Sequence, residues 1–94
     1  MNEELNTIAQ QLLDYWLNNN IVKNFNLFEL FIKVSKLSYM DNDKNEELLK
    51  LITYIEYQYA IPVLSINVNA WLEENEYNSF IYGIYQKLSS LKMI

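Results

Sequence analysis

Three glutamates close together in the sequence are the residues most suited to acid–base chemistry: Glu73, Glu74 and Glu76, in the stretch "EENE". Paired carboxylates act as general acid and base when burial drives their pKa values apart. Charged side chains are rarely buried without a partner, and these three fall where a bend between helices is expected. We therefore expect them to be solvated, and we predict that the protein is not an enzyme.

A second acidic stretch, "DNDKNE", places Asp41, Asp43 and Asn45 at alternate positions, as the start of a calcium-binding loop does. An EF-hand loop also needs glycine at its sixth position and glutamate at its twelfth. This sequence has Glu46 and Ile52 there. The acids are better explained by a helix N-terminus, with Asp43 as the N-cap and Glu46 completing an acidic capping box.

Composition excludes several other kinds of site. The chain has no cysteine, no histidine and one glycine, so zinc sites, histidine-dependent nucleophiles and glycine-rich phosphate loops are ruled out. We predict no metal and no cofactor. Seven lysines against twelve acids give a net charge of -5, which repels nucleic acid and anionic lipid and favours a basic protein partner. The acidic N-terminus and the lack of a long apolar run predict a cytoplasmic protein.

The elements that position these residues are predicted to be helices. Half of the 94 residues are hydrophobic, and one glycine with one proline leaves few hairpin turns. We predict one all-α domain over residues 1–94, a compact bundle of four main helices with an extra short helix after Pro62. Apolar spacing places the main helices at 3–17, 26–39 (capped by Asn26), 43–61 and 76–91, with a break in 73–76. Residues 63–70 alternate as a strand does, and loop, strand and helix stay open there.

The second helix has two apolar strips. One is the predicted core face, and its residues are Leu27, Leu30, Phe31, Val34 and Leu37. The other consists of Phe28, Ile32 and Tyr39 on a separate flank. This helix is therefore either central in the bundle or in contact with a second chain.

Six of the eight tyrosines, those from Tyr54 to Tyr85, divide into two groups. Tyr59 and Tyr77 fall on core faces, but four others do not. Tyrosine offers a large contact area at low entropy cost, and neighbouring acids steer a basic partner. We therefore predict a partner-binding surface made of Tyr54, Glu56, Tyr57, Glu73, Glu74, Glu76, Tyr82 and Tyr85. The alternative is that these tyrosines merely cover the flanks of a small bundle.

In size, charge and helicity, with the acidic tyrosine-bearing stretches "EYQY" and "EENEY", the chain resembles small acidic all-α bacterial immunity proteins, antitoxins and phage inhibitors. The resemblance implies a non-catalytic inhibitor that masks the active site of a basic toxin or nuclease. It assigns no role to any individual residue.

Two other functions are consistent with a small helical domain. The first is a structural or adaptor protein that forms a homodimer through Phe28, Ile32 and Tyr39. The second is a nucleic-acid regulator, against which the absence of arginine and the scattered lysines argue.

Overall fold

Helices make up the regular structure of the described chain, as predicted. The computed structural model describes residues 3–19, 25–59, 72–73 and 76–94, and no strand occurs among them. The predicted short helix after Pro62 and the alternating residues 63–70 lie outside the described residues. The elements are α1 (Glu3–Asn18), α2 (Phe25–Met40), the 3₁₀ helix η2 (Asn42–Lys44), α3 (Asn45–Gln58) and α5 (Tyr77–Ser90).

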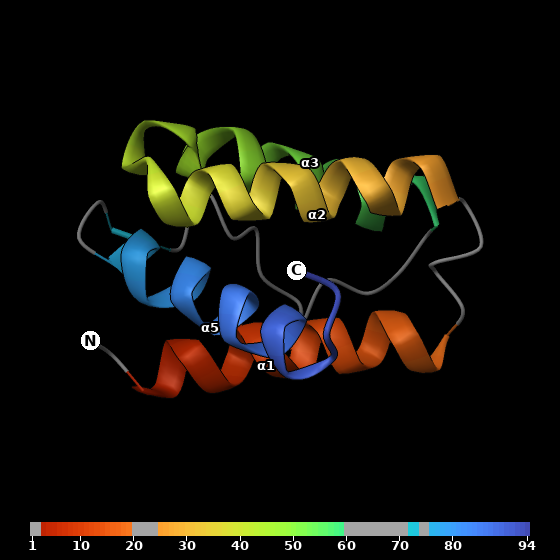
Figure 1. Cartoon of the computed structure of the whole chain (residues 1–94), viewed down its shortest axis with the longest axis horizontal. Coiled ribbons are helices and arrows are strands. Elements are labelled where there is room, and N and C mark those ends of the chain that lie inside the picture. The colour runs from red at the N-terminus through yellow and green to blue at the C-terminus, as the bar shows by residue number, and fades with distance from the viewer. Residues whose placement is uncertain (1–2, 20–24, 60–71, 74–75) are drawn as a thin grey trace.

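The helices form two layers. Figure 1 shows α2 and α3 lying along one side and α1 and α5 along the other. The most extensive contact joins α1 to α5, and α2 contacts both α3 and α5. An ion pair between Lys87 Nζ and Asp14 Oδ1 at 2.7 Å also links α1 to α5. None of the described helices has the length and apolar character needed to cross a membrane.

The core lies between these layers and centres on aromatic side chains. Trp16 of α1 meets Phe31 of α2 edge-on with ring centroids 4.9 Å apart, and Phe28 stacks on Phe31 at 5.9 Å. Such pairs contribute about 0.5–1.5 kcal/mol beyond the area they bury. Aliphatic side chains from α1, α3 and α5 complete the same cluster.

The predicted core face of α2 is wrong in part. Leu30 and Leu37 are 48% and 45% exposed, whereas Phe28 is buried and Ser35 and Ser38 are fully enclosed. Phenylalanine buries more apolar area than leucine, which favours turning this side inward. Burying the serines costs little because both hydroxyls donate, from Ser35 to the Phe31 carbonyl and from Ser38 to the Lys44 carbonyl, each at 2.8 Å.

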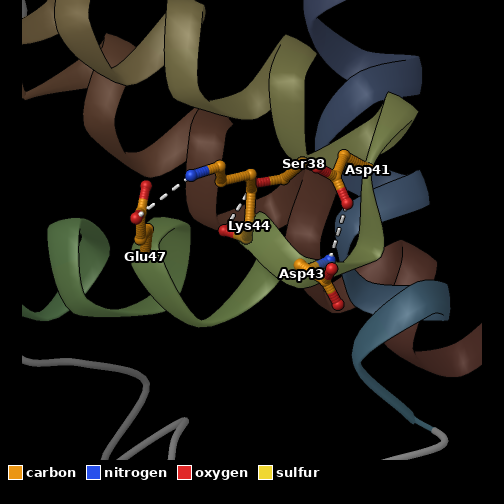
Figure 2. A network of polar contacts seen from close by, with 5 residues as sticks. All are labelled: Ser38, Asp41, Asp43, Lys44 and Glu47. Carbon is orange, nitrogen blue, oxygen red and sulfur yellow. Dashed lines mark hydrogen bonds and ion pairs between the residues drawn. The ribbon is translucent and has the colours of Figure 1, made fainter.

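The turn between α2 and α3 is closed by polar contacts (Figure 2). Asp41 Oδ1 accepts from the Asp43 backbone N–H at 3.1 Å, and Lys44 Nζ lies 3.5 Å from Glu47 Oε1. Asp41 is therefore the N-cap, of η2. The predicted capping box of Asp43 and Glu46 is wrong, because the chain first makes a 3₁₀ turn and α3 begins without a side-chain cap.

The other helix ends lie close to their predicted places. Helix α2 begins one residue before Asn26, its predicted cap, and α3 ends at Gln58, before the predicted limit at residue 61. Helix α5 begins at Tyr77, which confirms that no helix runs through Glu73.

Helix α5 ends in a turn that folds the last residues back. The N–H of Lys92 donates to the Ser89 carbonyl and the N–H of Met93 donates to the Leu88 carbonyl, both at 3.0 Å. This pair of hydrogen bonds defines a Schellman motif, whose left-handed position favours glycine. Lys92 occupies that position with φ 58°.

Replacing Lys92 with glycine is therefore expected to raise the free energy of unfolding by about 1 kcal/mol, because glycine adopts positive φ without a steric penalty. Urea denaturation of Lys92→Gly beside the parent chain measures the difference. Ser89→Gly, in the last turn of α5, is the matched control and should lower stability, since glycine has a lower helix propensity than serine. A loss of stability in both variants would contradict the proposed strain at position 92.

Candidate protein-binding surface

Three tyrosines from two helices stack against one another on the surface. The rings of Tyr39 and Tyr85 are nearly parallel, at 7°, with centroids 3.7 Å apart, and Tyr82 stacks beside Tyr39 at 6.1 Å. Tyr39 is 42% exposed, and Tyr82 and Tyr85 are half-buried. We call Tyr39, Tyr82 and Tyr85 the tyrosine cluster.

The cluster follows from helix register. Tyr82 and Tyr85 are three residues apart on α5 and so share one side of the helix, while Ile81, Ile84 and Leu88 are buried on its core side. Tyr39 lies at the second-to-last position of α2. The contact between α2 and α5 brings these positions together.

A hollow lies on each side of the cluster. The first, of about 350 Å³, is lined by Ser38, Tyr39, Asn42, Asn78, Ile81 and Tyr82. The second, of about 430 Å³, is lined by Gln10, Tyr39, Tyr82, Tyr85, Gln86, Ser89 and Ser90. Gln10 Nε2 donates to Gln86 Oε1 at 3.3 Å across the α1–α5 seam. The tyrosine faces are thus bordered by amide and hydroxyl groups, and none of the described residues that line either hollow is charged.

Several acidic residues lie close in sequence to the residues that line the first hollow. Asp41 and Asp43 flank Asn42 and are both exposed, and Glu76 lies two residues before Asn78. Tyrosine faces with nearby carboxylates suit a lysine or arginine side chain, which is attracted both to the aromatic ring and to the acids.

The described residues that line the two hollows are Ser, Asn, Gln, Tyr and Ile. Among the described residues, no three His, Cys, Asp or Glu side chains are grouped so as to hold a metal ion. The arrangement is suited to binding.

The structure brings together only part of the predicted partner-binding set. Tyr82 and Tyr85 join Tyr39, which the sequence analysis assigned to a self-association strip. Tyr54 and Tyr57 lie on α3, where both are exposed and Tyr57 is 85% exposed.

Glu56 is not a surface residue, and its assignment to the partner-binding surface is wrong. Its side chain is 1% exposed, and neither carboxylate oxygen has a hydrogen-bond partner among the described residues. Burial raises the pKa of Glu56 to about 7, because desolvation disfavours the charged carboxylate. Glu56 lies seven residues, about two helical turns, after Leu49, so both side chains are on the same side of α3, and Leu49 is also buried.

Two glutamates of the acidic stretch before α5, Glu73 and Glu76, are hydrogen-bonded to each other. Glu76 Oε2 accepts from the Glu73 backbone N–H at 2.9 Å, and the Glu76 N–H donates to the Glu73 carbonyl at the same distance. Glu73 is exposed and Glu76 is half-buried. Glu74 lies outside the described residues. Glu76 therefore stabilises the turn into α5, as the glutamate of a capping box does.

The predicted self-association strip is also divided. Phe28 is 7% exposed and stacks on Phe31 in the core. Ile32 is half-buried and packs against the hydrophobic core. Only Tyr39 of the three is exposed. The strip is not a free apolar flank, because α2 is rotated so that this side faces inward.

Sequence reasoning missed the amide residues around the cluster. Asn78 and Gln86 lie four residues before and after Tyr82 on α5, so a helical wheel places all three on one side. The spacing of Asn78 and Gln86 around Tyr82 was therefore a signal that the sequence alone contained. Asn42 and Gln10 come from other elements, and only the tertiary structure places them there.

No family model, curated protein or solved structure matches this chain.

Proposed function

We propose that this chain is a non-catalytic binding protein whose tyrosine cluster docks a basic protein. The observation that carries the proposal is the stack of Tyr39, Tyr82 and Tyr85 on the surface. The exposed acids Asp41 and Asp43 are the sequence neighbours of Asn42, which lines one of the two hollows. Tyrosine is enriched at the centres of protein interfaces, where rigid rings bury a large area. The net charge of -5 adds long-range attraction for a basic partner.

The particular form that we propose is an inhibitor of the immunity type, which masks the active site of a basic toxin or nuclease. Such an active site presents lysine and arginine to its own anionic substrate, and the same side chains fit the tyrosine faces and the carboxylates near them. The inhibitor needs no catalytic group of its own.

The test begins with a tagged pull-down at low and moderate salt, followed by purification of the retained protein and measurement of its affinity for designed variants. Tyr39→Ser is expected to weaken binding roughly 30-fold, the effect of losing a central interface residue worth about 2 kcal/mol. Tyr39→Phe keeps the stacked ring and should retain most of the affinity. Tyr57→Ser, which removes an exposed tyrosine from α3, is the matched control.

Charge is tested separately with Asp43→Lys and Glu73→Lys, which leave the Glu76 carboxylate in place. Both should slow association and flatten its salt dependence. A partner that loses affinity with Tyr57→Ser but not with Tyr39→Ser would refute the tyrosine cluster as the docking surface. Inhibition of the partner's own activity, measured with the same variants, distinguishes an inhibitor from a simple binder.

Self-association is the competing function. Among the described side chains of α2, the large apolar ones that are exposed are Leu30, Leu37, Tyr39 and Met40, whereas Phe28 is buried. A stable dimer in sedimentation experiments, together with no retained partner, would replace the inhibitor proposal.

A further inference from the structure

A third hollow lies between α2 and the residues that follow α5, and neither the tyrosine cluster nor the proposed function uses it. Its volume is about 600 Å³, within the range of about 300–1,000 Å³ typical of small-molecule sites. Four apolar residues line it: Phe28, Ile32, Met93 and Ile94. Three charged residues of α2 complete the lining: Glu29, Lys33 and Lys36.

Both walls of this hollow are held in place. Phe28 is fixed by its stack on Phe31 in the core. On the other side, the Schellman turn at Lys92 directs Met93 and Ile94 back toward α2, through the hydrogen bond from Met93 N–H to the Leu88 carbonyl. The apolar lining is therefore part of the fold.

The charge at its edge is unusual for this chain. The ion pairs between described residues engage Lys44, Lys50 and Lys87. Among the residues that the structure describes, Lys33 and Lys36 have no acid within ion-pair distance, although Glu29 lines the same hollow. Two of the three charged side chains at this edge are lysines, on a protein whose net charge is -5.

We propose that this hollow binds a free amphiphile with one alkyl chain and an anionic head group, such as a medium-chain alkyl carboxylate. The chain lies against Phe28, Ile32 and the two residues after Lys92. The carboxylate lies at the edge, where Lys33 and Lys36 offer ammonium groups.

Other occupants fit this hollow less well. A basic peptide would meet two lysines, so the partner of the tyrosine cluster does not belong here. A second copy of the chain would bring another net charge of -5 toward the first and be repelled. A neutral alkane would leave the two ammonium groups without a counter-charge.

The first test is an NMR titration of the full chain with decanoate below its micelle concentration. The methyl signals of Ile32, Met93 and Ile94 are expected to shift together and to saturate. From octanoate to dodecanoate, affinity should rise roughly two- to fourfold per added methylene, since each buried methylene contributes up to about a factor of four. Decyltrimethylammonium, which has a similar chain and the opposite charge, should bind at least roughly tenfold more weakly.

Lysine variants distinguish the contribution of the anionic head group to binding from that of the alkyl chain. Lys33→Gln with Lys36→Gln should weaken decanoate binding roughly tenfold and leave decanol binding unchanged, as two partly exposed ion pairs predict. Lys50→Gln, which removes a lysine from α3, is the matched control and should bind decanoate like the parent.

Three results would overturn the site: no methyl shifts at saturating decanoate, equal binding of the cationic amphiphile, or shifts of the same methyl groups that depend on protein concentration alone. The last would make this hollow a contact between copies. Binding to anionic vesicles without binding of free decanoate would also refute a site for a free acid.

Discussion

Replacing Gly83 with alanine is expected to lower the free energy of unfolding by about 2 kcal/mol. A Cβ at this position would lie 2.5 Å from the Asn6 carbonyl oxygen, 2.6 Å from the Asn6 Cα and 2.9 Å from the Ala9 Cβ. The first two atoms belong to the backbone of α1, so relief requires α1 and α5 to separate. Because the clash is with backbone atoms, we expect a cost at the upper end of the typical range of about 1–3 kcal/mol. Alanine adds about 1 kcal/mol of helix propensity, which leaves a net loss of about 2 kcal/mol.

Urea denaturation of Gly83→Ala measures this loss, with Ser89→Ala at an exposed position of α5 as the control that reports propensity alone. Adding Ala9→Gly to Gly83→Ala should restore little stability, because it removes the side-chain contact and leaves the contacts with the Asn6 backbone. If Gly83→Ala were as stable as the parent or more so, the close approach of α1 and α5 would be wrong. The same separation would shift Gln10 relative to Gln86, beside the tyrosine cluster.

The second large effect concerns pH and Glu56. Burial raises the pKa of Glu56 to about 7 from 4.5, so the folded state holds its proton more tightly than the unfolded chain does. This contribution to stability is fully present below the unfolded pKa and is lost as pH rises through the folded pKa. We expect the parent chain to lose roughly 2–3 kcal/mol of stability between pH 5 and pH 8 from this group.

Glu56→Gln keeps the shape of the side chain and removes its ionisation, so the difference between parent and variant isolates this effect. At pH 8 the variant should be more stable than the parent by up to about 3 kcal/mol, and at pH 4 the two should be nearly equal. Unfolding by denaturant at several pH values provides the measurement. Glu46→Gln, an exposed glutamate on the same helix, should leave the pH dependence unchanged. A parent chain whose stability is flat from pH 5 to pH 8 would show that Glu56 is solvated.

The sequence by itself determined the all-helical character and the approximate limits of the helices α1, α2, α3 and α5. These features depend on apolar spacing within one segment, which is local information. The absence of cysteine and histidine likewise excluded whole classes of site without any structure. The surplus of tyrosine outside the core faces was also visible in the sequence, and Tyr82 and Tyr85 are half-buried outside the core cluster.

Only the tertiary structure decided which side of α2 faces inward. Two apolar strips compete on that helix, and the choice depends on what the neighbouring helices offer. Phe31 packs edge-on against Trp16 and Phe28 stacks on Phe31, while the enclosed Ser35 and Ser38 donate to backbone carbonyls. This rotation moves Phe28 and Ile32 from the predicted surface to the wall of a hollow.

The same dependence on neighbours explains the remaining differences. Whether a glutamate beside a core face is solvated or buried depends on how closely other segments cover it, so the burial of Glu56 and its raised pKa were not readable from spacing. The stack of Tyr39 on Tyr85 joins residues 46 positions apart in the sequence. Periodicity describes each helix alone, whereas the tyrosine cluster and the three hollows are formed by contacts between elements.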